Sequence, residues 1–141
     1  MVSIDQVMRI YEGILKRDLP KAEWTHGAHL CAGTAIIIKR GIEKAELDMP
    51  DIIRNYNLAC GVKNTETDGY HHTITMSYLR IIAKFLNDNF KRRCEIGASA
   101  SAVLADDIAD PKHLLKFFSR DLLFSVKARK EWQDPDLRAL P

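Results

Sequence analysis

Histidine is the residue type in this sequence best suited to acid–base or metal chemistry, and four of the five histidines occur in two short polar segments. His26 and His29 stand three positions apart, so on a helix their Cβ atoms would lie about 5–6 Å apart on one face. His71 stands in a second segment, where Thr75 and Tyr78 follow it at helical steps of four and three. We therefore expect two polar clusters, each on one face of a helix.

Both clusters continue apolar stripes, which predicts that they face the protein interior. The face of His26 and His29 continues to Ile36 and Ile37. A buried polar group without a partner costs about 1–3 kcal/mol, so we expect the two clusters to meet each other, a metal ion or a ligand. His72 lies about 100° around the helix from its neighbour His71, and the sequence leaves open which of the two faces inward.

One hypothesis is a metal site formed by His26, His29 and His71. Three neutral imidazoles with an open fourth position suit Zn²⁺ or another divalent ion, and helical bundles commonly hold such metals. The metal would activate water, with Tyr78 or Thr75 orienting a substrate. A carboxylate from one of three residues, Glu12, Glu66 or Asp68, could complete the ligand set.

Other interpretations use the same histidines without a metal. In one, a bundle cavity holds a small molecule against Tyr11, Trp24, Tyr70 and Tyr78, as in a non-catalytic binding or sensor module or a metal-free acid–base site. In another, the histidines only form hydrogen bonds near helix starts. A zinc peptidase is disfavoured, because Gly27 stands where an HExxH motif places its glutamate.

Arg129 extends an apolar stripe that includes Phe118 and Leu122. An arginine in this position could pair with Asp121, clamp an anionic ligand with its planar fork, or extend its charged head to solvent at a helix end. The predicted ligand-binding set is Trp24, Tyr70, Thr75, Tyr78 and Arg129.

Helices must position these side chains, because apolar residues recur at three- and four-residue steps through most of the chain. The sequence shows no strand-like alternation, hairpin dipeptide or useful internal repeat. We therefore predict an all-α fold, a single compact bundle of about five or six helices over residues 1–141. The expected helical segments are 3–16, 22–40, 50–60, 70–90 and 111–126.

Residues at the expected boundaries favour these limits. Ser3 could cap the first helix, and Thr67 or Asp68 the helix over 70–90. Pro50 suits the first turn of a helix, and Ser119 could interrupt the last pattern and cap a new turn. Residues 97–109 are ambiguous between a helix and a loose connection. The tail over 135–141 is expected to wrap back over the bundle.

Composition is that of an ordinary globular protein, with 46% hydrophobic and 28% charged residues. The 21 basic and 19 acidic side chains leave a net charge of +2, so charge indicates neither a nucleic-acid partner nor a charged membrane surface. The basic run of Lys91, Arg92 and Arg93 is expected to be a solvated helix end.

The chain is expected to be cytoplasmic. Its first residues interleave charged and apolar side chains, unlike a signal peptide, and no apolar run approaches the roughly 20 residues that span a bilayer. The three cysteines, Cys31, Cys60 and Cys94, form no CxxC pair and are expected to be small buried hydrophobes. If a helix face stays apolar and exposed, a homodimer is the expected assembly.

Three segments also carry a resemblance. The pattern Trp-Thr-His-x-x-His-Leu over 24–30, the pattern Gly-Tyr-His-x-Thr-x-Thr over 69–75 and the closing Pro135-Asp136-Leu137 resemble segments of small uncharacterised bacterial helical proteins. This resemblance implies a helical fold and a bacterial source, and it implies no activity. The three-histidine bundle is also loosely similar in fold to DinB-like metal proteins.

Overall fold

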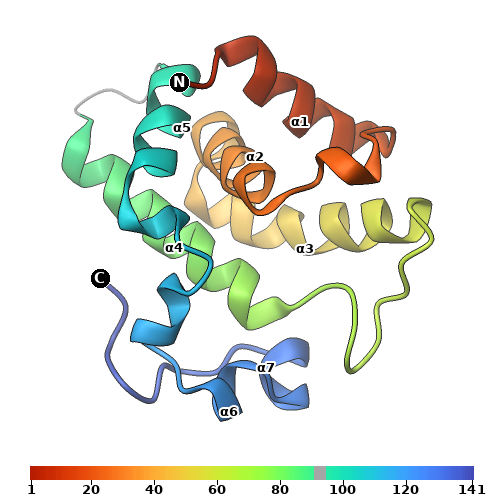
Figure 1. The fold of residues 1–141 in the computed structure, drawn as a ribbon, viewed down its shortest axis with the longest axis vertical. Helices are drawn as coiled ribbons and strands as arrows, with labels where there is room; N and C mark the ends of the chain where they lie inside the picture. The colour runs from red at the N-terminus through yellow and green to blue at the C-terminus, as the bar shows by residue number, and fades with distance from the viewer. Residues whose placement is uncertain (91–94) are drawn as a thin grey trace.

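The computed structural model describes residues 1–90 and 95–141, and in these residues the chain is helical, without strands (Figure 1). The predicted all-α fold is confirmed. Cys94 and the basic run before it lie outside the described residues. Five longer helices form the bundle: α1 (Ile4–Lys16), α2 (His26–Arg40), α3 (Ile42–Ala59), α4 (His72–Asn89) and α5 (Ile96–Ala105). The shorter elements are the 3-10 turns Lys21–Glu23, Asp107–Ala109 and His113–Lys116, and the helices α6 (Arg120–Leu123) and α7 (Val126–Lys130).

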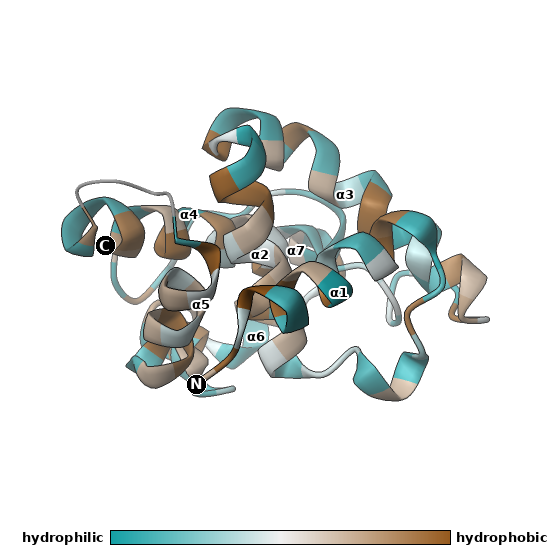
Figure 2. Ribbon diagram, turned by 90° about the horizontal axis from the view of Figure 1, so that it is seen from above, coloured by the Kyte–Doolittle hydropathy of each residue, from teal (hydrophilic) through white to brown (hydrophobic). Residues whose placement is uncertain are grey.

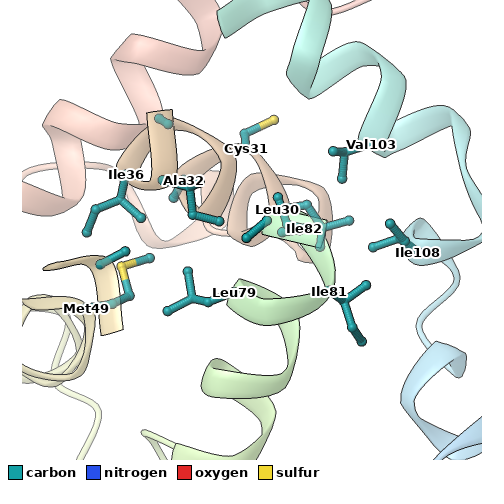
Figure 3. Packing of buried hydrophobic residues seen from close by; sticks show 14 of the residues in the cluster. Leu30, Cys31, Ala32, Ile36, Met49, Leu79, Ile81, Ile82, Val103 and Ile108 are labelled. Atoms are coloured by element: carbon teal, nitrogen blue, oxygen red, sulfur yellow. The ribbon is translucent and has the colours of Figure 1, made fainter. Parts of the chain in front are cut away.

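Helix α2 occupies the centre of the bundle and packs against α1, α3, α4 and α5. It begins at His26 rather than at residue 22, because the Thr25 hydroxyl caps it by accepting the Ala28 N–H at 3.2 Å. Figure 3 shows Leu30 of α2 and Leu79 of α4 among the side chains that fill the shared interior. Cys31, a free cysteine, is buried in this core as expected.

Helix α3 begins eight residues before the predicted start at Pro50. Gly41, at a φ of +82°, turns the chain directly from α2 into α3, so Pro50 lies inside the helix instead of in its first turn. The proline has no N–H to donate to the carbonyl of Glu46, and this one missing hydrogen bond does not end the helix. Burial of Pro50 with Ala45 and Met49 offsets that loss. Hydrophilic and hydrophobic residues alternate along α3 in Figure 2.

Helix α4 begins at His72, and its cap is His71 rather than Thr67 or Asp68. The His71 side chain accepts the N–H of Ile74 at 3.1 Å. Thr67 and Asp68 instead lie in a turn, where both their N–H groups reach the Thr65 hydroxyl. The cap therefore comes from a residue type that sequence propensities do not favour.

The ambiguous segment 97–109 contains α5 followed by a 3-10 turn. Close packing against the start of α1 supports this helix, because a Cβ on Gly97 would lie 3.0 Å from the backbone nitrogen of Ile4. The hydroxyl of Ser101 both accepts the N–H of Val2 and donates to its carbonyl, each at 3.1 Å. Figure 1 shows the resulting position of the N-terminus beside α5.

The expected helix over 111–126 is instead a series of short turns. Ser119 caps α6, as predicted, and Ser125 caps α7 in the same way. The tail wraps back, because Asp136 accepts hydrogen bonds from the Ser119 nitrogen at 2.7 Å and from its hydroxyl at 2.6 Å. Figure 1 shows α6 and α7 below the start of α4, and the tail running away from them to the C-terminus at the left. Over the described ranges, no helix has the length and apolar character needed to cross a membrane.

Candidate ligand-binding site

A cavity of about 340 Å³ lies between α2, α3 and α4. We call it the apolar cavity, because aliphatic side chains from all three helices make most of its wall, among them Leu30, Met49, Ile53, Leu79 and Ile82. Figure 3 shows Leu30, Met49 and Leu79 projecting from these three helices toward the interior. Four polar residues complete the wall: His26, His29, Thr75 and Tyr78.

Gly33 helps to keep this cavity open. It lies on the cavity wall of α2, and a Cβ at this position would stand 3.3 Å from Cδ1 of Ile82 on α4. A larger side chain would therefore extend into the space between the two helices. Glycine is unfavourable inside a helix by about 1 kcal/mol relative to alanine, so this open volume is obtained at a cost in helix stability.

A second cavity, of about 290 Å³, adjoins the first. We call it the aromatic cavity, because Trp24, Tyr70 and His71 contribute to its wall together with Asn57. The two cavities have four wall residues in common: His29, Ile53, Ile74 and Thr75. Seven of the eight predicted site residues therefore border one or both of these cavities, and Arg129 is the exception. Tyr11 borders neither, because it is buried on α1 and its hydroxyl accepts from Arg40.

His29 stands where the two cavities adjoin, with its ring stacked on Trp24 at a centroid distance of 3.7 Å. Its Nδ1 lies 2.6 Å from the carbonyl oxygen of Thr25. A carbonyl can only accept, so Nδ1 carries the proton and Nε2 of the neutral ring has a free lone pair. His29 is nevertheless an exposed residue, so it faces the interior only in part. The surrounding protein lowers its pKa by desolvation, an effect that the Thr25 carbonyl opposes and the nearby His26 adds to. The neutral form is therefore favoured near pH 7.

His26 and Tyr78 meet on the wall of the apolar cavity. Their rings are edge to face, with centroids 5.7 Å apart. Nε2 of His26 is buried and, within the described part of the chain, has no hydrogen-bond partner. Burial, with a smaller contribution from Asp110, raises the pKa of Tyr78 to about 12, so its hydroxyl stays protonated at neutral pH.

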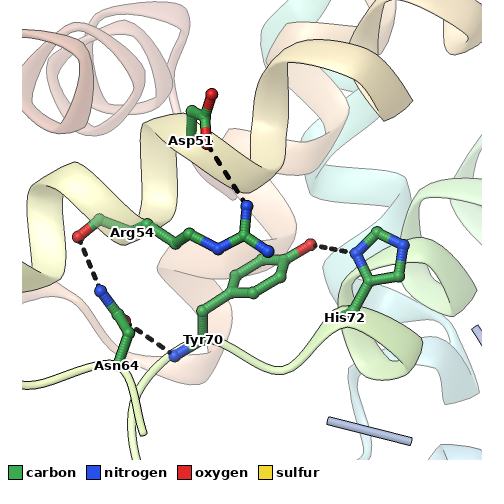
Figure 4. Close-up of polar contacts among 5 residues, drawn as sticks. All are labelled: Asp51, Arg54, Asn64, Tyr70 and His72. Atoms are coloured by element: carbon green, nitrogen blue, oxygen red, sulfur yellow. Dashed lines mark hydrogen bonds and ion pairs between the residues drawn. The ribbon is translucent and has the colours of Figure 1, made fainter. Parts of the chain in front are cut away.

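His71, rather than His72, is the inward-facing histidine. It is buried, and its Nε2 lies 2.6 Å from the carbonyl oxygen of Leu123, to which it donates. Because Nδ1 accepts from Ile74, both ring nitrogens are in use. His72 is half-buried, and its Nδ1 is hydrogen-bonded to the Tyr70 hydroxyl at 2.9 Å (Figure 4).

The arrangement does not support the predicted metal site of His26, His29 and His71. Among the residues that the structure describes, no group of three or more histidine, cysteine, aspartate or glutamate side chains is placed to hold a metal ion. His71 has no nitrogen left for a metal. Of the proposed carboxylates, Glu66 pairs with Lys130 at 2.6 Å on the surface.

Arg129 binds the backbone of the turn before α4. Its Nη1 donates to the carbonyl oxygens of Gly69 at 2.9 Å and of Tyr70 at 3.3 Å, and no pairing with Asp121 is seen among the described residues. It borders a separate surface cavity of about 290 Å³ with Arg54 and Lys130. Arg129 is thus a support for the site rather than part of its wall.

Sequence reasoning missed the contribution of α3. Met49, Ile53 and Asn57 stand at four-residue steps and reach the cavities because the helix begins at Ile42. That periodicity is visible in the sequence once the helix is extended through Pro50.

Sequence reasoning also missed a polar network behind Tyr70, because no regular spacing of residues in the sequence predicts it. Asn64 accepts the Tyr70 N–H and donates to the Arg54 carbonyl (Figure 4). The Arg54 guanidinium lies 4.4 Å above the Tyr70 ring. The network positions the Tyr70 ring at the wall of the aromatic cavity.

A scan against protein-family models, a search of curated proteins and a search of solved structures each find no match for this chain. The resemblance to small bacterial helical proteins and the loose likeness to DinB-like metal proteins therefore stay predictions.

Proposed function

We propose that this protein is a non-catalytic binding or sensor module that holds a small, largely apolar molecule between α2, α3 and α4. The observation that carries the proposal is the apolar cavity, whose volume of about 340 Å³ lies at the lower end of the range found for ligand sites, roughly 300–1,000 Å³. A small ring or short chain suits this volume, since an apolar cavity of about 150 Å³ can bind benzene.

The composition of the wall supports this function over a catalytic one. Aliphatic side chains provide most of the contact surface, and a few polar groups, His26, His29 and Tyr78, stand at defined positions. This combination is typical of pockets that bind by burial of apolar surface and orient the ligand with few hydrogen bonds. A metal-dependent reaction remains the competing hypothesis and is tested below.

The test uses toluene as the probe and a pair of matched glycine variants on α2. Gly33→Val extends into the apolar cavity, whereas a Cβ on Gly27 meets Cδ2 of Leu104 at 3.7 Å, outside it. Addition of toluene should shift the amide resonances of residues around the cavity in wild type and in Gly27→Val. These shifts should reach a plateau as the toluene concentration rises. Gly33→Val should weaken this binding at least about tenfold, which corresponds to about 1.4 kcal/mol.

Gly33→Ala serves as a milder variant if valine disturbs folding, and thermal unfolding of each variant checks that the helices remain intact. Equal toluene binding by Gly33→Val and Gly27→Val, or no saturable binding to wild type, would overturn the proposal. Elemental analysis of wild type purified without chelators provides the second arm. A stoichiometric metal that is lost when His26, His29 and His71 become alanine would favour the metal hypothesis instead.

A further inference from the structure

The polar groups at the junction of the two cavities carry information about the ligand's chemistry. Because the cavities have four wall residues in common, a molecule in the apolar cavity can place one end beside His29, Trp24 and Tyr70. The His29 ring is held by its stack on Trp24 and by the hydrogen bond from Nδ1 to the Thr25 carbonyl. Its orientation is therefore determined before any ligand arrives.

The open polar atoms here accept hydrogen bonds. Nδ1 of His29 is bound to Thr25, so Nε2 has a lone pair, and on this exposed residue no protein partner for it is present among residues 1–90 and 95–141. Asn57 donates its amide nitrogen to Oδ1 of Asn64 at 3.1 Å, which leaves its own Oδ1 as a second acceptor on the wall of the aromatic cavity. A ligand group that donates a hydrogen bond fits both positions.

Two neighbouring polar groups, His71 and Thr75, are already in use, whereas Nε2 of His26 is not. His71 uses both ring nitrogens, and the Thr75 hydroxyl donates to the His71 carbonyl at 2.8 Å. Neither cavity has a lysine or arginine side chain in its described wall. A carboxylate or phosphate would therefore enter an apolar site without a countercharge, which is costly.

We infer that the ligand is a small neutral hydroxyl compound, an apolar alcohol or phenol, whose body fills the apolar cavity and whose hydroxyl donates to Nε2 of His29. This inference rests on the proposed function, because it names the chemical class that the same cavity selects. A hydroxyl satisfies the acceptor without bringing a charge, and the apolar wall contacts the rest of the molecule.

The test compares three probes with the same ring: toluene, benzyl alcohol and benzoate. Each is titrated into the full chain near pH 7.5 and followed by amide shifts. Wild type should bind benzyl alcohol more tightly than benzoate. His29→Phe keeps an aromatic ring beside Trp24 and removes Nε2. It should therefore lower the affinity for benzyl alcohol about tenfold and change the affinity for toluene less than about twofold.

His113→Phe is the matched control, because His113 is a buried histidine that borders neither cavity. It should leave the ratio of benzyl alcohol to toluene affinity unchanged. The ring nitrogen resonances of His29 in wild type give a readout that needs no substitution: Nε2 should shift with benzyl alcohol and stay in place with toluene.

The outcomes separate the two proposals. If toluene binds in the apolar cavity but His29→Phe leaves the benzyl alcohol to toluene ratio unchanged, the hydroxyl inference is wrong and the proposed function stands. Tighter binding of benzoate than of benzyl alcohol would also overturn the inference. If none of the three probes binds wild type, both proposals fail.

Discussion

At the scale of single residues, the neutral histidine at the start of α4 links local structure to a distant part of the chain. His71 accepts the Ile74 N–H as a helix cap and donates to the carbonyl of Leu123, 52 positions away. Both bonds require one tautomer of the uncharged ring. Burial lowers the pKa of His71 below its usual 6.5, and the nearby Arg129 adds to this effect against the opposing Leu123 carbonyl.

This depressed pKa predicts that stability falls with acidification. Below about pH 6.5 the unfolded chain binds a proton that folded His71 resists, so the free energy of unfolding should be larger at pH 7.5 than at pH 5.5. The slope approaches about 1.4 kcal/mol per pH unit for each such histidine. Urea titrations of wild type and His71→Asn at both values check this. Asparagine keeps a side-chain acceptor for the helix cap but cannot be protonated in this range. It should therefore reduce the difference in free energy of unfolding between pH 7.5 and pH 5.5.

Other histidines contribute to the same slope, because desolvation also lowers the pKa of His72, of His113 and, less strongly for stability because the residue is exposed, of His29. His71→Asn should therefore reduce the pH dependence without abolishing it. His71→Ala loses the cap as well and should cost about 1 kcal/mol more at pH 7.5. An undiminished pH difference in His71→Asn would assign the acid sensitivity to the other histidines.

At the scale of elements, the turn before α4 positions the aromatic cavity. Gly69 has a φ of +80°, and a Cβ there would lie 2.6 Å from both the Lys63 carbonyl oxygen and Oδ1 of Asn64. Asn64 in turn holds the Tyr70 backbone. The conformation of one glycine therefore determines where Tyr70 and the cap residue His71 lie before α4.

Gly69→Ala should destabilise the protein far more than Gly61→Ala, although both glycines have a positive φ. Gly61, at +78°, has open space around the Cβ position, so alanine there meets only the left-handed backbone penalty of about 1–2 kcal/mol. Gly69→Ala adds a contact with backbone and should cost roughly 3 kcal/mol or more. Guanidinium unfolding measures the difference in free energy of unfolding between the two variants. Equal losses of stability would show that the turn at Gly69 changes conformation to accommodate alanine.

At the scale of the whole molecule, the C-terminal segment is fastened to the first turn of α4. The buried Thr73 hydroxyl donates to the carbonyl of Glu131 at 2.9 Å and accepts the N–H of Gln133 at 3.1 Å. The Arg80 guanidinium lies 4.2 Å above the Trp132 ring. These contacts, with the His71 bond to Leu123, hold residues 120–137 against the helix that forms one wall of both cavities.

Thr73→Val should therefore destabilise the fold by about 1–3 kcal/mol, because it keeps the side-chain shape and leaves two backbone groups unpaired. Thr73→Ser retains the hydroxyl and should cost less. Thermal unfolding compares the two, and limited proteolysis should show earlier cleavage near Glu131 in Thr73→Val. Equal stability of the valine and serine variants would mean that water replaces both hydrogen bonds.

Helix content and the inward faces of the polar clusters follow from local rules, and the sequence determines them. Periodic apolar residues must be buried, so His26, Thr75 and Tyr78 could be placed on interior faces without knowledge of the partners. The cap of Ser3 on α1, with the reciprocal bond that the Ser3 N–H donates to the Gln6 side chain, is local in the same sense.

The tertiary structure alone decided which polar groups are free and which are satisfied. His71 and Arg129 use partners 52 and 60 positions away, and such pairs leave no spacing signal in the chain. It also decided that α3 continues through Pro50, because burial outweighs one missing hydrogen bond there. Periodicity fixes the direction of a side chain, whereas packing between distant segments fixes the atom it meets.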